Sequence, residues 1–422
     1  MRHALTAIAV LALASACASP GLPPGGPTIS AFPRVVVTLP DTNALNVKPN
    51  KVLVRYDDVI SEQANGAPLN RSVLISPWDG EPRVEWKRTG MTIRPRDGWR
   101  ANTAYTITIL PGIGDLKGRP IPTGYVLRFS TGATIPTGVL RGDVFDWVAN
   151  RALAKATVLA TDVKDTSLVY LTVADSSGRF TLGAMPPGTY LVRAIDEKTP
   201  NRALDAREPW DSATVTVADS ARAEFYTFVH DTLPARISEI RQGDSLSIVI
   251  VMDKPLLPGV AIPATAAHIV TADSTIVNVA TIMTAAEERI AREKADSIAR
   301  AADTTRRGQP EGPRRTIDPT RRRDTAAVVP PPMPKRTPPA TELIIKLRDV
   351  LKPGTTYRVT LSGVKNLLGI EGTSSRLLII PRAPASDSTR ARPPATPPAR
   401  PDSTRTPPGT VVPPPASRRP SR

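Results

Sequence analysis

The chain has 422 residues, of which 46 are proline and only 4% are aromatic. This length predicts about three domains, and the composition excludes one large hydrophobic core. The net charge is +16, but residues 284–340 (13 Lys and Arg against 8 Asp and Glu) and 383–422 (7 Arg against 2 Asp) supply most of the excess. Neither stretch contains an aromatic residue, whereas nucleic-acid-binding surfaces interleave aromatic and basic side chains, so no nucleic-acid partner is expected.

Residues 1–17 have the composition of a secretory signal. A basic start is followed by a short apolar run, residues 4–13, whereas a membrane-spanning helix needs roughly 20 apolar residues. The only cysteine of the chain, Cys17, follows the small residues Ala14, Ser15 and Ala16. One interpretation is plain secretion with a cysteine there by chance. A lone free cysteine would be a liability in an oxidising compartment, which favours a modified Cys17.

The same stretch resembles the bacterial lipobox, in which small residues precede a cysteine that becomes diacylated. Ala14 stands where that family usually has leucine. The resemblance implies lipidation of Cys17, attachment to a membrane through the lipid, and cleavage of the signal peptide before Cys17. Ala18 follows where lipoproteins retained in the inner membrane often carry aspartate, so the resemblance implies an outer-membrane location.

Residues 18–30 are rich in proline and glycine and are expected to be a tether. Residues 31–132 follow with an all-β pattern. Short β-branched and aromatic runs alternate with turn signals such as Asp79-Gly80 and Asp97-Gly98. The clearest strand is the strictly alternating run of residues 105–109. Strands at this spacing predict a β-sandwich.

Several motifs in residues 31–132 resemble the SbsA-type bacterial Ig-like domain, and they occur in the right order. They are Val36-x-x-Leu39-Pro40, Asn46-Val47-x-Pro49-Asn50, Leu74-Ile75-Ser76-Pro77, Ile93-x-Pro95, Asn102-Thr103-x-Tyr105-x-Ile107, the turn Asp115-x-x-Gly118, and Phe129-Ser130-Thr131-Gly132. The resemblance implies a sandwich that acts as a spacer or binding module, and it implies no catalysis.

Residues 136–232 are predicted to form a second β unit. Its motifs are Asp175-Ser176-Ser177-Gly178-Arg179-Phe180 and Met185-Pro186-Pro187-Gly188-Thr189-Tyr190. This pattern resembles the carboxypeptidase-regulatory, transthyretin-like domain, with Met185 in place of the usual leucine. The resemblance implies a small prealbumin-like sandwich that carries no zinc and hydrolyses nothing.

The acids that follow, from Asp196 to Glu208, raise the alternative of a calcium site. An EF-hand loop needs acids at fixed positions and a central glycine, but Pro200 lies near the glycine position and Lys198 replaces a ligand. The sequence therefore favours a structured loop packed by Trp210, with a weak surface calcium site as the alternative.

Residues 236–381 are predicted to form a second Ig-like domain, split by an insertion at 284–340. The segment around Tyr357 (residues 354–361) repeats the segment around Tyr105 (residues 102–109). The similarity extends beyond these segments. Asp115, with glycines at 112 and 118, corresponds to Asn366, with glycines at 363 and 369. Internal repeats of this kind predict two copies of one fold, with Tyr105 and Tyr357 in equivalent positions.

Within the insertion, Thr284 and Glu287 form a capping box that predicts a helix reaching about residue 302. Favourable pairs four residues apart, Glu288 with Arg292 and Asp296 with Arg300, support it. Residues 304–339 lose the helical pattern. Residues 383–422 are a Pro, Arg, Ser and Thr tail with no periodicity, and the sequence predicts that this tail is disordered.

No catalytic, cofactor-binding or metal site is predicted. Nucleophilic catalysis needs a nucleophile, a base and an orienting group, but beyond the signal the chain has only His230 and His268 and no free thiol. A zinc site needs three or four ligands at close spacing, which neither histidine has. His230 is expected to cap a strand at a domain boundary. The paired carboxylates of a glycosidase are not excluded.

The fold class predicted is all-β: tandem antiparallel sandwiches (Ig-like, prealbumin-like, Ig-like) with a helical insertion. Three functions remain open. The first is a non-catalytic, lipid-anchored envelope protein that acts as a scaffold or spacer, with other envelope proteins as partners. The second is a module that binds polysaccharide or a cell-wall polymer, with Trp78, Trp86 and Trp99 as stacking residues or, alternatively, as packing residues. The third is an unrecognised hydrolase.

Overall fold

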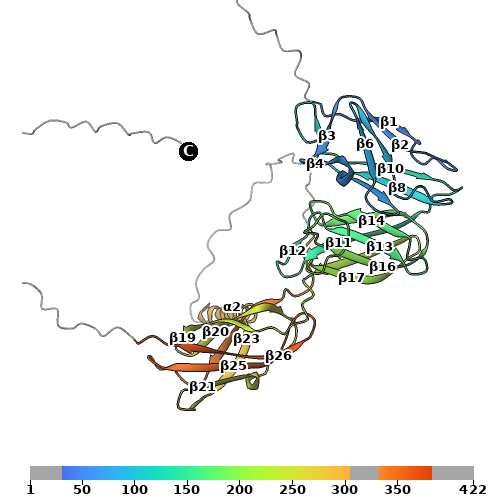
Figure 1. Ribbon diagram of the computed structural model, residues 1–422. Coiled ribbons are helices and arrows are strands. Elements are labelled where there is room, and N and C mark those ends of the chain that lie inside the picture. The colour runs from blue at the N-terminus through green and yellow to red at the C-terminus, as the bar shows by residue number, and fades with distance from the viewer. Residues whose placement is uncertain (1–30, 305–331, 383–422) are drawn as a thin grey trace, which may run out of the picture.

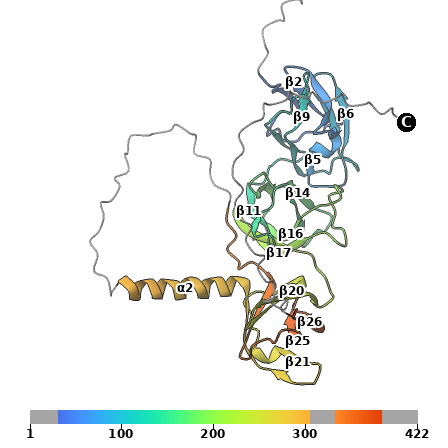
Figure 2. The ribbon, with the colours of Figure 1, turned by 90° about the vertical axis from the view of Figure 1, so that its left-hand side faces the viewer.

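The computed structural model describes residues 31–304 and 332–382, and these residues form a stack of three β-sheet modules (Figure 1). The two views, a quarter turn apart, both place the modules end to end in chain order (Figures 1 and 2). Each module has its own cluster of buried hydrophobic residues. The predicted all-β class is confirmed, and the sheets are antiparallel with one exception, described below.

The first module packs two main sheets face to face. One sheet has the order β1-β2-β7-β6, the other β10-β8-β5, and a small sheet β4-β3-β9 lies beside them. The strands are β1 Val35–Leu39, β2 Val52–Tyr56, β3 Ile60–Ala64, β4 Ala67–Pro68, β5 Val73–Ser76, β6 Arg83–Lys87, β7 Gly90–Arg94, β8 Ala104–Ile109, β9 Ile113–Asp115 and β10 Tyr125–Ser130, with a 3₁₀ turn at Leu69–Ser72. The inward residues of β2, β7 and β8 are almost fully buried, as their alternation predicts.

The second module also has two sheets. They are β12-β11-β15, to which β18 adds, and β14-β13-β16-β17. The strands are β11 Gly138–Asp146, β12 Arg151–Ala152, β13 Thr157–Asp162, β14 Val169–Val173, β15 Arg179–Met185, β16 Gly188–Ile195, β17 Trp210–Val217 and β18 Ser220–Thr227. Strand β18 pairs with β11 in parallel, which is the exception to the antiparallel rule.

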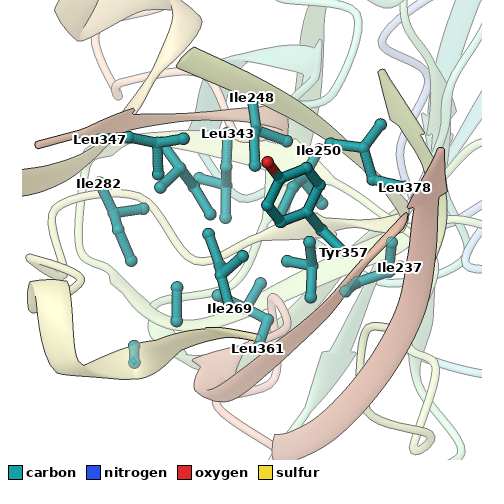
Figure 3. Packing of buried hydrophobic residues seen from close by; sticks show 14 of the residues in the cluster. Ile237, Ile248, Ile250, Ile269, Ile282, Leu343, Leu347, Tyr357, Leu361 and Leu378 are labelled. Carbon is teal, nitrogen blue, oxygen red and sulfur yellow. The ribbon is translucent and has the colours of Figure 1, made fainter. Parts of the chain in front are cut away.

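The third module repeats the topology of the first. Its sheets have the orders β19-β20-β24-β23 and β22-β21-β25-β26, so that β2, β7 and β8 correspond to β20, β24 and β25. The strands are β19 Ile237–Asp244, β20 Ser247–Leu256, β21 Ala267–Thr271, β22 Ile276–Val277, β23 Val279–Thr284, β24 Ala340–Leu347, β25 Thr356–Lys365 and β26 Glu371–Ile379, with a 3₁₀ turn at Ala264–Ala266. Figure 3 shows Tyr357 among Ile248, Ile250 and Leu343 in the core.

The insertion lies between β23 and β24, where the first module has only Arg88 and Thr89 between β6 and β7. Strand β24 pairs with β20 on one side and with β23 on the other, so sequence from before and after the insertion shares one sheet. A long insertion is tolerated at a hairpin because loop-closure entropy grows only slowly with length.

The helix of the insertion, α2 (Ala285–Thr304), projects sideways from the third module (Figure 2). Its capping box forms as predicted: the Thr284 N–H donates to Glu287 at 2.7 Å, and the Glu287 N–H donates to Thr284 Oγ1 at 3.2 Å. Glu288 pairs with Arg292 at 3.3 Å and with Lys346 of β24 at 2.8 Å. Ile290 and Ile298 are both about 60% exposed, so the helix is attached mainly through its first turns.

Candidate functional site

The predicted lipidation residue, Cys17, lies outside the described residues, as do residues 305–331 and 383–422. Among the helices of residues 31–304 and 332–382, none is long and apolar enough to cross a membrane. Lipidation of Cys17 therefore stays a prediction from the sequence.

The three tryptophans predicted to stack on a ligand have different surroundings. Trp99 packs edge-on against Tyr105 and Phe129, with ring centroids 4.8 and 5.2 Å away, and belongs to the first core. Trp86 lies on the edge strand β6, is 42% exposed, and donates from Nε1 to the carbonyl of Ile60 at 2.9 Å. Trp78 follows β5 at the boundary with the second module. Trp99 is thus a packing residue, whereas Trp86 is exposed and Trp78 is partly exposed and lines a pocket.

Trp78 lies at a bonded junction between the first and second modules. Its backbone N–H donates to the carbonyl of Val169 at 2.6 Å, and Ser76 Oγ accepts from the N–H of Leu171 at 3.1 Å. The Arg100 guanidinium donates to the hydroxyl and the carbonyl of Ser167 at 3.0 and 3.1 Å. The bonds of Trp78 and Ser76 connect the end of β5 directly to β14, and those of Arg100 join the loops before β8 and β14.

A pocket of about 260 Å³ opens beside this junction. Its lining combines Trp78 with polar side chains from both modules, among them Asn70, Glu81, Asn201 and Arg202. Arg202 donates to the carbonyl of Arg71 at 3.3 Å and pairs with Glu197 at 3.1 Å, so it contributes to both modules. An aromatic face beside amide and charged groups suits a polar ligand with flat apolar patches.

The loop between β16 and β17 is held by Glu208, which is 4% exposed. Its carboxylate accepts from the N–H groups of Lys198, Thr199 and Asp205 at 2.7 to 3.1 Å. Burial raises the pKa of Glu208, but these backbone hydrogen bonds outweigh it and hold the pKa below its usual value. The described residues contain no group of three His, Cys, Asp or Glu side chains that could hold a metal ion.

A larger pocket, of about 420 Å³, lies between the second and third modules. Four aspartates line it: Asp146, Asp196, Asp231 and Asp253. Each has a partner nearby. Asp231 pairs with Lys254 at 2.8 Å and Asp196 with Lys198 at 2.7 Å, Asp253 accepts from the Arg236 N–H at 2.6 Å, and Asp146 accepts from the Ala149 N–H at 3.0 Å. The hydrogen bond from Lys254 lowers the pKa of Asp231. Of these four contacts, the Asp231–Lys254 pair joins the linker after β18 to the third module, and the other three each lie within one module.

His230 stacks near this pocket between two aromatic rings. Its ring centroid is 3.9 Å from that of Trp210, with an interplanar angle of 12°, and 4.2 Å from that of Phe228. Nδ1 lies 3.1 Å from the carbonyl oxygen of Phe228. Burial lowers the pKa of His230, which favours the neutral ring. Trp210 begins β17 and packs on this histidine; that it also packs the preceding loop stays a prediction.

Asn366 connects the third module to the linker that precedes it. This side chain is 3% exposed, and its Nδ2 donates to the carbonyls of Asp231 and Leu233, both at 2.9 Å. Its Oδ1 accepts from the N–H groups of Leu368 and Ile370, which closes the turn after β25. The Asn366 side chain therefore stabilises both the turn after β25 and the junction between the second and third modules.

A second connection runs from the insertion to the second module. Residues 332–339, here called the strap, precede β24. They contact a site on the second module, here called the aromatic site, that consists of the rings of Trp147 and Tyr226 and the carboxylate of Glu224. Trp147 Nε1 donates to the carbonyl of Thr337 at 3.0 Å, and the Lys335 N–H donates to the Tyr226 hydroxyl at 3.1 Å. The Lys335 ammonium group pairs with Glu224, and this hydrogen bond lowers the pKa of Glu224.

The sequence did not single out Trp147 or Tyr226, and it pointed to Asn366 only as a member of the internal repeat. For Asn366 a signal was present: it occupies the position of Asp115 in the internal repeat, and an amide can donate where a carboxylate cannot. Trp147 and Tyr226 are 79 residues apart in the chain and carry no local signal of a shared site.

Comparison with known proteins gives one family match. A model of the bacterial Ig-like domain matches residues 30–131, the range of the first module. No curated protein matches the chain.

Three solved structures illustrate what the chain is similar to. An L,D-transpeptidase from Mycobacterium smegmatis has 17% identity and a TM-score of 0.19, covering 38% of this chain and 60% of that one. The N-terminal part of the bacterial S-layer protein SbsC has 17% identity and a TM-score of 0.19, with coverage of 45% and 44%. BcpA, the major pilin subunit of Bacillus cereus, has 13% identity and a TM-score of 0.17, with coverage of 47% and 71%.

This chain thus spans 60% of the transpeptidase and 44% of the SbsC fragment. At these identities and scores, no function of these proteins is transferred to it. The family match and the sheet order together assign the bacterial Ig-like fold to the first module.

Proposed function

We propose that the chain is an exported envelope lipoprotein, anchored through Cys17, that acts as a non-catalytic spacer or scaffold. The observation that carries the proposal is that both module junctions are bonded directly. Neighbouring domains usually move relative to one another unless their interface holds them. Here β5 bonds to β14 at the first junction, and Asn366 and the strap hold the second. A spacer needs such junctions because it must keep its far end at a defined distance from the membrane.

The rigidity of the stack is tested with two spin labels in a Cys17→Ser chain. Lys87→Cys on β6 and Arg376→Cys on β26 place one label in the first module and one in the third, both at exposed positions. We expect one narrow distance distribution by pulsed electron paramagnetic resonance. Lys87→Cys with Lys117→Cys, both in the first module, is the matched control for label mobility. A distribution much broader than that control contradicts a rigid spacer.

The lipid anchor is tested separately. Each buried methylene of an acyl chain contributes roughly 0.8 kcal/mol to membrane binding, and several chains together hold firmly. Cys17→Ser is therefore expected to leave the protein without lipid and to shift it to the soluble fraction. Incorporation of radiolabelled palmitate into the Cys17→Ser protein would exclude Cys17 as the lipidation site.

A second candidate function, binding of an envelope polysaccharide, is favoured by the pocket beside Trp78. It combines an aromatic ring with amide and charged groups from two modules, a combination that suits a sugar. Trp78→Leu should abolish binding of cell-wall oligosaccharides measured by calorimetry, whereas Trp86→Leu on edge strand β6 should not. Equal binding by both variants rules this pocket out.

A further inference from the structure

The strap contacts the second module through Lys335, Arg336 and Thr337, and the last two begin the tetrapeptide Arg336-Thr337-Pro338-Pro339. The Arg336 guanidinium lies over the ring of Tyr226, 4.5 Å from its centroid, and 5.9 Å from the ring of Trp147. Trp147, which is only 8% exposed, donates from Nε1 to the Thr337 carbonyl at 3.0 Å. A cation over an aromatic face and a hydrogen bond to a backbone carbonyl therefore act on adjacent residues.

The prolines explain why this segment fits. A residue that precedes proline is restricted to an extended conformation, so Pro338 orients the Thr337 carbonyl before binding. Recognition of proline-rich segments by aromatic grooves uses this preformed, extended backbone. The Tyr226 hydroxyl adds a further contact, because it accepts from the Lys335 N–H at 3.1 Å and donates to Glu224 at 3.2 Å.

The same tetrapeptide stands once more in the chain, as Arg405-Thr406-Pro407-Pro408. Arg336 and Thr337 contact Tyr226 and Trp147 through a guanidinium and a backbone carbonyl, and Arg405 and Thr406 carry the same two groups. One difference is that Thr404 takes the place of Lys335, so the second copy has no ammonium group for Glu224. At this site the strap therefore makes one ion pair, Lys335 with Glu224, that the second copy lacks.

We propose that the aromatic site of Trp147, Tyr226 and Glu224 is a recognition site for the Arg-Thr-Pro-Pro tetrapeptide, with residues 405–408 of the same molecule as a second ligand. The two copies then compete for one site. Binding of 405–408 displaces the strap and releases the insertion from the second module, which leaves Asn366 and the Asp231–Lys254 pair to hold that junction.

The chain length permits this exchange. Strand β26 begins beside the junction, where Gly372 lies close to Pro234, and its nine residues lead away from it for about 30 Å. The residues between Arg382 and Arg405 span up to about 75 Å when extended, which is enough to return. Because both ligands belong to the same molecule, each has an effective concentration on the order of millimolar.

The test uses the full chain with a photo-cross-linking residue, benzoylphenylalanine, in place of Thr410. In the native background the strap occupies the site, and in a Lys335→Ala/Arg336→Ala background it is weakened. We expect the weakened strap to increase cross-linking of residue 410 to the peptides that contain Trp147 or Tyr226, as mapped by mass spectrometry. Adding Arg405→Ala should remove that increase. Arg390→Ala is the matched control, because in Arg390-Ala391-Arg392 no proline follows the residue after the arginine, and it should leave the cross-link unchanged.

A peptide experiment does not depend on the stability of any site variant. A fluorescent peptide of residues 401–412 is titrated into the full chain carrying Lys335→Ala, Arg336→Ala and Arg405→Ala. We expect the same peptide with Arg405→Ala to bind about three- to tenfold more weakly, the loss that one cation–π contact represents. Equal affinity of the two peptides overturns the proposal. So do cross-links that ignore Arg405→Ala, and cross-links that join two molecules, since the ligand would then not be intramolecular.

Discussion

Tyr105 and Tyr357 make the same hydrogen bond in two different modules. Each hydroxyl accepts at 2.7 Å from the backbone N–H five residues earlier, that of Arg100 for Tyr105 and that of Lys352 for Tyr357. Both tyrosines lie near the start of corresponding strands, β8 and β25, and both are almost fully buried. This confirms the equivalence predicted from the repeat and matches the tyrosine corner of other β-sandwiches.

Removing either hydroxyl should destabilise only the module that contains it. Tyr105→Phe and Tyr357→Phe each lose one hydrogen bond, which is worth about 1 kcal/mol in free energy of unfolding. Amide hydrogen exchange should speed up in β8 for the first variant and in β25 for the second. In the double variant the two losses should add, because the sites share no partner. Faster exchange in both modules from one substitution would contradict this independence.

The corresponding residues Asp115 and Asn366 close the same turn with different outer partners. Each Oδ1 accepts from the N–H groups two and four residues later. Asp115 Oδ2 then pairs with Arg119 at 2.7 Å, whereas Asn366 Nδ2 donates to the linker carbonyls of Asp231 and Leu233. Asn366→Asp would point a carboxylate at two carbonyl oxygens.

We therefore expect Asn366→Asp to lower the free energy of unfolding of the third module by about 2 kcal/mol, since a buried side chain loses its donor amide and gains a carboxylate in its place. Hydrogen exchange at Leu233 and Leu257, on either side of the linker contact, should accelerate. The reciprocal change, Asp115→Asn, keeps the turn and loses only the pair with the partly exposed Arg119, so it should cost about 1 kcal/mol or less. An effect of Asn366→Asp no larger than that control would show that the linker bonds are dispensable.

The split third module makes a prediction about proteolysis. From the sequence, we expect brief trypsin treatment to cut first at the arginines within 306–323 or in the tail at 383–422. The two parts of the third module should stay associated, because β24 lies between β20 and β23 in one sheet. Gel filtration of the nicked protein without denaturant should give one peak. First cuts between residues 50 and 230, or two peaks, would contradict the split-module interpretation.

His230 predicts a pH dependence. Burial lowers its pKa below the usual 6.5 in the folded state, so the unfolded chain binds the proton more readily. Its contribution to stability is therefore complete above pH 6.5 and is lost as the pH falls below that value toward the lowered folded pKa. The melting temperature of the native chain should drop as the pH falls from about 6.5 to about 5.5, just below the usual histidine pKa.

His230→Phe is the control for this pH dependence. The phenyl ring preserves the stack with Trp210 and Phe228 but cannot be protonated, and the neighbouring Asp211 is unchanged. The variant should show a smaller decrease of melting temperature over the same pH range. Equal decreases for both proteins would assign the effect to carboxylates.

The local elements of this protein were determined by its sequence alone. Strict alternation predicted β8, the capping box of Thr284 and Glu287 predicted the start of α2, and the repeat around Tyr105 and Tyr357 predicted two modules of one topology. These signals are readable because side-chain periodicity, caps and turns depend on residues a few positions apart.

The tertiary structure alone decided which distant strands pair within a module and how the modules are connected. Strands β17 and β18 alternate weakly and expose much of their surface, so no apolar pattern marks them, and the parallel pairing of β18 with β11 joins residues 81 positions apart, as in Val139 with Ser220. The contact of Trp147 with Thr337 spans 190 positions. Such contacts depend on which surfaces the folded modules bring together, and no local propensity encodes that choice.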